Sequence, residues 1–271
     1  MGSAEVWRQA APLQCYLMDT GNQGLDNGIR GIIFDLGGTL MYFDGDWDEK
    51  AHQGAVNMAA FLRRQRVQID EALLVGAFKA ARRAGWIQAT RGGREVTCAQ
   101  SMWTALREVE APPEAFALVP EAVRVYFGPE EAAWKPYPDA KATLKRLSQQ
   151  GCRLGLLSNA TDDALIQRLV NRLELRPWLS PVFASANLGC RKPLRGPFDL
   201  ILSRWNLPAA SVLMVGDTLN ADILGAHNAG MPGVLITADE AQSNHEHRAT
   251  IIPDATINTL SDLPPLIDAW R

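Results

Sequence analysis

The stretch GIIFDLGGTL, residues 31–40, joins a short apolar run to an acid, two glycines and a threonine. Together with the residues just before it, the run has the length of a strand and is rich in isoleucine, which predicts a strand covered on both faces. Asp35 follows this strand directly. A carboxylate in that position often just caps the next turn, so its role depends on what the rest of the chain places beside it.

Beyond residue 135 the sequence alternates between strand-like and helix-like segments. Such alternation is typical of a parallel sheet with right-handed crossovers, and it predicts an α/β fold class with a doubly wound parallel sheet. We predict strands over residues 152–158, 181–185, 211–217 and 233–237, and helices over residues 142–151, 162–173, 196–207 and 220–230.

Residues 46–134 have a different character, because they show no strand-like runs. Their alanine-rich stretches repeat apolar residues at helical spacing, which predicts about four helices over residues 49–64, 70–84, 96–109 and 112–127. We therefore predict an all-helical domain over residues 46–134, inserted into a core domain made of residues 29–45 and 135–271. Residues 1–28 have no clear period, and we interpret them as a loosely attached arm or an overlong start.

The composition limits the classes of function. A net charge of −3 argues against a nucleic-acid binder, which would carry a basic stripe. No segment approaches the roughly 20 apolar residues that span a bilayer. The four cysteines are far apart and lack the spacing of metal ligands, so we expect them to be reduced and the protein to be cytoplasmic. Oligomeric state is not predicted by any of these features.

Three predicted strands end in side chains that can do chemistry: Asp35, Ser158 and Asp217. In doubly wound sheets, ligands bind beyond the carboxyl ends of the strands, so these side chains are expected to meet. A carboxylate can attack phosphorus, and Mg²⁺ bound by further carboxylates offsets the repulsion between two anions. Lys192 can hold the phosphoryl oxygens, and Asp222 supplies another acid. The set is suited to phosphoryl transfer.

These segments, DLGGT, SN after an apolar strand, RKP and GDTLNADILGAHNAGM, resemble the haloacid dehalogenase-like hydrolase superfamily over residues 29 to about 265. The resemblance implies a Rossmann-like core, a helical cap of the first type that selects a small phosphorylated metabolite, and an aspartyl-phosphate formed on Asp35. It also implies that Lys192 is catalytic. The implied phosphate-binding residues are Gly38, Thr39, Ser158, Asn159 and Lys192, and the implied Mg²⁺ ligands are Asp35, Gly37 through its carbonyl, Asp217 and Asp222.

Gly37 departs from the family pattern. Phosphatases of this family usually have a second aspartate there, which protonates the leaving oxygen and activates water. Such acid–base help is typically worth about 100- to 10,000-fold in rate. Glycine keeps the backbone carbonyl and eases a turn with positive φ. We hypothesise that an acid of the segment YFDGDWD, Asp44 before Asp46 or Asp48, partly replaces the missing one; the alternative is that all three are solvated turn residues.

Other activities stay open. Haloacid dehalogenases also lack the second acid, but they do not use Mg²⁺ and their fourth motif departs from GDxxxxD. Since this chain keeps both acids in GDTLNAD, residues 216–222, a magnesium-dependent phosphatase is favoured over a dehalogenase. A phosphonatase would need a cap lysine, for which Lys50 and Lys79 are candidates by residue type. A phosphate-binding relative without turnover is a further alternative.

Two polar segments have simpler explanations. In AGWIQATRGGRE, residues 84–95, Arg91 and Arg94 could hold a second anionic group of the substrate beside Trp86, but we favour the simpler interpretation of an exposed turn between helices with solubilising arginines. The segment SNHEHR, residues 243–248, has two histidines but no third metal ligand, and we interpret it as a solvated loop.

Overall fold

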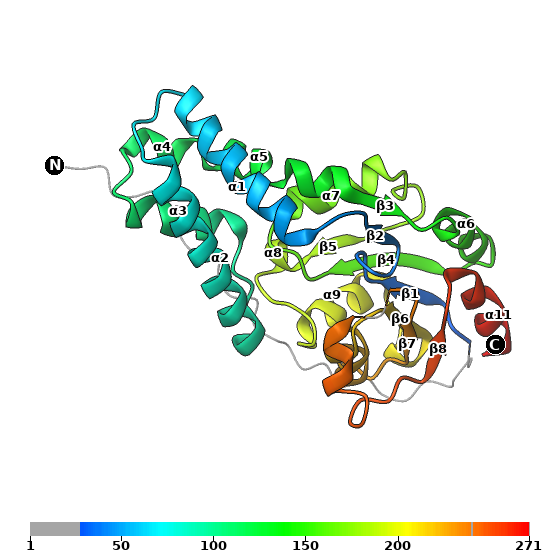
Figure 1. Cartoon of the computed structure of the whole chain (residues 1–271). Helices are drawn as coiled ribbons and strands as arrows, with labels where there is room; N and C mark the ends of the chain where they lie inside the picture. Colours follow the sequence, from blue (N-terminus) through cyan, green and yellow to red (C-terminus); the bar gives the residue numbers. More distant parts are fainter. Residues whose placement is uncertain (1–27, 240, 271) are drawn as a thin grey trace.

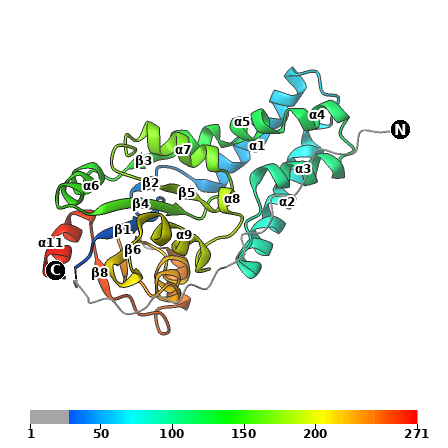
Figure 2. The same cartoon turned by 180° about the vertical axis from the view of Figure 1, so that it is seen from behind.

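The protein, described by a computed structural model over residues 28–239 and 241–270, is built from an α/β core and a helical insert beside it (Figures 1 and 2). This confirms the predicted fold class. The arm predicted for residues 1–28 lies, except for Gly28, outside the described residues. No helix in the described ranges has both the length and the apolar character needed to cross a membrane.

The core contains a six-stranded sheet in which all neighbouring strands are parallel. Its order is β5-β4-β1-β6-β7-β8, so the chain turns to one side of β1 first and later crosses to the other. The strands are β1 (Gly31–Phe34), β4 (Arg153–Ser158), β5 (Val182–Ala184), β6 (Val212–Gly216), β7 (Gly233–Ile236) and β8 (Ala255–Ile257).

Strand β1 is central, and all four of its residues are buried. Phe34 lies opposite Leu156 of β4 and Val215 of β6, so the carboxyl ends of the three strands reach the same edge of the sheet. The strand order reverses beside β1, which is where doubly wound sheets bind their ligands.

Alternate residues of β1 pack into two different hydrophobic clusters. Ile32 and Phe34 belong to one cluster with α6, α7 and α11, whereas Ile33 belongs to the other with α9 and α10. Both faces of the strand are therefore dry, as its continuous apolar sequence predicts. The core helices are α6 (Ala140–Gln149), α7 (Asp163–Arg172), α8 (Ser185–Leu188), α9 (Gly196–Trp205), α10 (Leu224–Asn228) and α11 (Leu263–Ala269).

Two core segments differ from the sequence prediction. The helix predicted over residues 220–230 is a π-helical segment, Leu219–Ile223, followed by the short α10. The last strand and helix, β8 and α11, were not predicted, because β8 has only three residues and α11 contains two prolines.

The helical insert lies between β2 (Met41–Phe43) and β3 (Trp134–Pro136), which pair as an antiparallel ribbon. Helix α2 (Glu71–Gly92) is longer than the helix predicted over residues 70–84. It ends at Gly93, which has a φ of 69° in the left-handed region. The insert helices are α1 (Trp47–Arg64), α2 (Glu71–Gly92), α3 (Cys98–Glu108), α4 (Pro113–Ala117) and α5 (Val119–Ala133).

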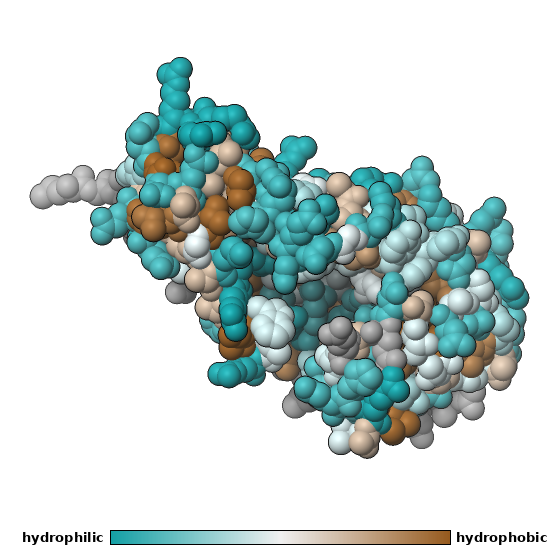
Figure 3. All heavy atoms as spheres, viewed as in Figure 1, coloured by the Kyte–Doolittle hydropathy of each residue, from teal (hydrophilic) through white to brown (hydrophobic). Residues whose placement is uncertain are grey.

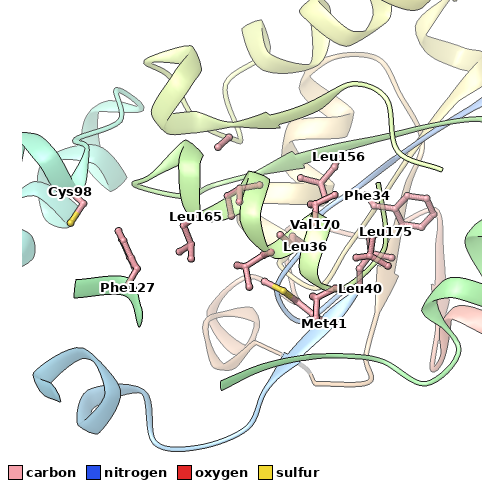
Figure 4. Packing of buried hydrophobic residues seen from close by; sticks show 14 of the residues in the cluster. Phe34, Leu36, Leu40, Met41, Cys98, Phe127, Leu156, Leu165, Val170 and Leu175 are labelled. Atoms are coloured by element: carbon pink, nitrogen blue, oxygen red, sulfur yellow. The ribbon is translucent and has the colours of Figure 1, made fainter. Parts of the chain in front are cut away.

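The insert shares a hydrophobic cluster with the core. Figure 4 follows this cluster from Leu36 and Leu40 through Leu165 of α7 to Phe127 and Cys98 of the insert. The apolar contact between the two parts is therefore continuous along α5 and α7.

The turn after α2 gives the insert a second attachment to the core. The backbone N–H of Arg191 donates to the carbonyl of Gly93 at 3.0 Å, and that of Glu95 donates to the carbonyl of Gly189 at 3.1 Å. The buried carboxylate of Glu95 also accepts from Oγ of Ser185 at 2.5 Å. The insert is thus joined to the loop that precedes Lys192.

Gly54 permits the close contact between α1 and α5. A Cβ at this position would lie 2.1 Å from the backbone oxygen of Tyr126. We predict that Gly54→Ala lowers the free energy of unfolding by about 1–3 kcal/mol, because the two helices must separate. Urea unfolding monitored by circular dichroism measures this change.

The matched control is Gly76→Ala in α2. A Cβ there meets nothing within 4 Å, and alanine should raise the free energy of unfolding by about 0.5–1 kcal/mol. Equal stability of Gly54→Ala and the wild type would contradict the close helix contact.

Candidate active site

The candidate site lies where β1, β4 and β6 end, under the helical insert. A cavity of about 1170 Å³ opens there, and Figure 3 shows the hollow between the two parts of the molecule. Asp35, Ser158, Asp217 and Asp222 all line this cavity. Asp35 is fixed by its backbone N–H, which donates to the carbonyl of Val215 at 2.9 Å. The three strand ends thus bring together side chains far apart in the sequence.

Lys192 lies at the centre of the cluster and is buried. Its Nζ is 2.6 Å from Oδ1 of Asp35, 2.6 Å from Oδ1 of Asp222, and donates to the carbonyl of Leu157 at 2.7 Å. A buried ammonium needs such partners, because its desolvation is costly. Lys192 therefore links Asp35, the candidate nucleophile, to Asp222 in the segment after β6.

The acids of the cluster have shifted pKa values. Burial raises the pKa of Asp35 to about 6, although Lys192 draws it down and Asp222 pushes it up. Burial raises the pKa of Asp217 to about 8, with Asp35 and Asp222 acting in the same direction. For Lys192, burial lowers the pKa, but Asp222 and Asp35 more than offset this, so it lies above its ordinary value. The cluster holds more negative charge than one lysine can balance.

Two glycines make room for these acids. A Cβ on Gly38 would lie 2.7 Å from the carboxylate of Asp217, and a Cβ on Gly216 would lie 2.2 Å from that of Asp222. Gly38 also has a φ of 73°, so the positive φ of this turn falls there and not on Gly37.

The donor set fits a divalent cation. Carboxylate oxygens of Asp35, Asp217 and Asp222 lie within 4.8 Å of one another. Oδ1 of Asp222 is buried without an aligned hydrogen-bond donor, while its Oδ2 accepts from the N–H of Thr218 at 3.0 Å. Oxygen ligands that combine carboxylates with a backbone carbonyl, which Gly37 offers at the same cavity, suit Mg²⁺.

The residues predicted to bind phosphate differ in what their side chains contact. Ser158 lines the cavity, and its hydroxyl makes no hydrogen bond to another residue within 28–239 and 241–270. The amide of Asn159 is committed to Lys192, donating to its carbonyl at 3.0 Å and accepting from its N–H at 2.9 Å. Thr39 is buried and does not line the cavity. Ser158 and Gly38 are thus free to face a phosphate. The ammonium of Lys192 lines the cavity but is already bound by Asp35, Asp222 and the carbonyl of Leu157, and Asn159 positions Lys192.

Trp134 occupies the space beside Gly37. A Cβ on Gly37 would lie 2.9 Å from Cη2 of the Trp134 ring. That ring packs edge-on against Phe43 and Trp47, which keeps it in place. An aspartate at position 37 would therefore require Trp134 to move. The packing of Trp134 is thus consistent with the absence of the second acid at this position.

The acids proposed as its substitute lie mostly elsewhere. Asp44 is exposed and does not line the cavity, so the hypothesis that placed it first gains no support. Asp46 caps α1 by accepting from the N–H of Glu49 at 2.7 Å. Asp48 does line the cavity, although it is exposed.

The arginines near the substrate space are not those expected from the Gly-Gly turn. Arg94 lines a separate groove, and Arg91 is an exposed residue in the last turn of α2. Trp86 lines the cavity as expected. The guanidinium groups that border the cavity belong to Arg82, Arg83 and Arg191. Of the turn itself, Gly93 lines the cavity, whereas Arg91 and Arg94 do not.

Asn244 is a site residue that the sequence did not reveal, since its segment reads as a solvated loop. Its side chain is fully buried, donates to the carbonyl of Asp217 at 2.7 Å, and accepts from the N–H of Leu219 at 2.8 Å. It fixes the backbone between the two acids that follow β6. A polar residue in a polar loop gives no sequence signal for this contact.

Comparison with known proteins agrees with this geometry. The family model for haloacid dehalogenase-like hydrolases matches residues 29–230. The chain belongs to this family. The matched range includes Asp35, Ser158, Lys192 and Asp217, which the fold brings to one cavity.

Relatives with assigned names are mostly phosphatases. A phosphoglycolate phosphatase of Yersinia pseudotuberculosis is 30% identical over 243 residues, covering 88% of this chain and 93% of the relative. A ribulose-1,5-bisphosphate 5-phosphatase of Halopiger xanaduensis is 34% identical over 148 residues, covering 51% of this chain and 62% of the relative. A solved 2-haloacid dehalogenase of Pseudomonas syringae has a TM-score of 0.65 and is 26% identical, covering 90% of this chain and all of that one.

Removing the Asn244 amide should weaken cation binding. We predict that Asn244→Leu reduces Mg²⁺ affinity by about 10- to 100-fold, because the backbone that carries Asp217 is no longer held. The Mg²⁺ concentration that gives half of the maximal thermal stabilisation measures the affinity. An unchanged midpoint would show that Asn244 has no such role.

The raised pKa values of Asp35 and Asp217 also predict a pH dependence of stability. Both folded-state values lie above those of unfolded aspartate, so the folded state binds more protons. Stability in EDTA should therefore fall as pH rises from about 4 to about 8. In Asp217→Asn the free energy of unfolding should fall less steeply with pH than in the wild type, as measured by urea unfolding at a series of pH values. The same slope in both proteins would contradict the raised pKa of Asp217.

Proposed function

We propose that the protein is a magnesium-dependent hydrolase of a small phosphate monoester. The observation that carries this proposal is the convergence of Asp35, Asp217 and Asp222 around one buried lysine. Three carboxylates beside a single ammonium leave a surplus of negative charge, which a divalent cation would balance.

The reaction would begin with the carboxylate of Asp35. One of its oxygens attacks phosphorus, the bond between phosphorus and the ester oxygen breaks, and an aspartyl-phosphate forms. Lys192, 2.6 Å from Oδ1, orients the attacking carboxylate and adds positive charge where the transferred group is negative. Water then attacks the aspartyl-phosphate and releases inorganic phosphate.

The other residues hold the transferred group. The hydroxyl of Ser158 faces the cavity and can donate to a phosphoryl oxygen, and the glycine turn at Gly38 brings the backbone close. Asp35, Asp217 and Asp222, with the carbonyl of Gly37, would hold Mg²⁺. When bound, Mg²⁺ reduces the repulsion between the attacking carboxylate and the phosphate.

The substrate would lie between the core and the helical insert. The cavity of about 1170 Å³ is large enough for a small metabolite, and residues of both parts line it. We assign the insert, residues 46–134, the role of a cap domain over the core of residues 29–45 and 135–271. The phosphoglycolate phosphatase relative supports a small phosphorylated metabolite as substrate.

A haloacid dehalogenase is the second candidate, since Trp134 fills the space of a second acid and the solved structure that is 26% identical bears that name. The acidic cluster favours the phosphatase, because displacement of a halide from carbon needs no Mg²⁺. A phosphonatase is less well supported, since neither Lys50 nor Lys79 lines the cavity.

The test is hydrolysis of p-nitrophenyl phosphate, whose leaving group barely needs protonation. We predict Mg²⁺-dependent turnover that is lost in EDTA, and that Asp35→Asn lowers kcat by more than about 10³-fold. Chloride release from 2-chloropropionate in EDTA would support the dehalogenase instead. Tight phosphate binding without any turnover would identify a binding protein.

A further inference from the structure

The proposed reaction needs a general acid and base, and none of the residues described above supplies one. An alkoxide or phenoxide is a poor leaving group unless it is protonated as it departs, and the later attack of water is faster when a base accepts its proton. Gly37 can do neither, and Trp134 blocks a side chain there. The group that does so must be a titratable side chain at the same cavity.

Glu130 is such a group. It lies in the last turn of α5, is half-buried and lines the cavity together with Asp35 and Gly37. Its Oε1 accepts from Nε1 of Trp134 at 3.4 Å, the same ring whose far edge meets the Cβ position of Gly37. Glu130 therefore contacts one edge of the Trp134 ring, and the Cβ position of Gly37 meets another edge of the same ring.

The surroundings of Glu130 raise its pKa, so that a large fraction of its carboxyl groups stays protonated near neutral pH. Burial raises its pKa to about 7, against the lowering effects of the Trp134 indole and of Arg82 on α2. Asp162, before α7, and Glu131 on its own helix also raise it. No basic group within residues 28–239 and 241–270 forms an ion pair with Glu130. The neighbouring Glu131, by contrast, pairs with Arg168.

We propose that Glu130 is the general acid and base that replaces the missing residue, which rests on the phosphatase function proposed above. As Asp35 bonds to phosphorus and the ester bond breaks, the proton of Glu130 passes to the ester oxygen, directly or through one water, and an alcohol leaves. Water then attacks the aspartyl-phosphate, returns a proton to Glu130, and releases Asp35 and inorganic phosphate. Both carboxyl groups end in their starting forms.

The remaining acid at the cavity is a weaker candidate. Asp48 lines the cavity but is exposed at the start of α1, where water solvates its charge. Glu130 combines access to the cavity with a proton.

The experiment compares two esters of similar shape, p-nitrophenyl phosphate and phenyl phosphate, because only the second needs a proton on its leaving group. We predict that Glu130→Gln lowers kcat/KM for phenyl phosphate by about 100-fold or more, but changes that for p-nitrophenyl phosphate by less than about threefold. Glutamine keeps the size of the side chain and the acceptor for Trp134. Glu121→Gln, on the exposed side of the same helix, is the matched control and should change neither value.

The pH profile gives a second measure. For the wild type, kcat/KM for phenyl phosphate should fall above about pH 7 as Glu130 loses its proton, and this fall should be absent in Glu130→Gln. An equal loss for both esters, or an ester-dependent loss in Asp48→Asn instead, would overturn the proposal while leaving the phosphatase intact. A wild type that hydrolyses neither ester would refute the phosphatase function itself.

Discussion

The buried ammonium of Lys192 is the contact on which the site depends. It bonds to the carboxylate of Asp35 and approaches that of Asp222, so it joins the end of β1 to the segment after β6. Buried charges are stable only when their partners are well placed, so the loop before α9 must hold the ammonium accurately. Asn159 does this through two hydrogen bonds to the backbone of Lys192. The geometry of the nucleophile therefore depends on residues from three separate strand ends.

Much of the core could be predicted because its signals are local. The strands β1, β4, β6 and β7 are short apolar runs followed by polar residues, and a buried parallel strand needs no other pattern. The acids and the lysine of the site could be predicted because parallel strands bring their carboxyl ends together. The extension of α2 to Gly92 could not be predicted from the sequence. Gly85 and Gly92 lower the helix propensity of this segment, whereas tertiary packing stabilises the helix.

What a side chain touches could be predicted less well than its presence at the site. Asn159 has the residue type of a phosphate ligand, but its amide is used by Lys192. Asn244 belongs to a polar loop, yet it is fully buried beside Asp217. Trp134 lies nearly a hundred residues from Gly37, and only the fold shows that its ring fills the space of the missing acid. Such contacts join distant parts of the chain, and residue spacing carries no information about them.

The attachment of the insert at Gly93 has a consequence for the charge balance of the site. The backbone N–H of Arg191 donates to the carbonyl of Gly93, and Arg191 is the neighbour of Lys192 in the chain. The position of the ammonium is therefore coupled to the position of the turn after α2. A substitution in that turn can alter the electrostatics around Asp35 without contacting Asp35 itself.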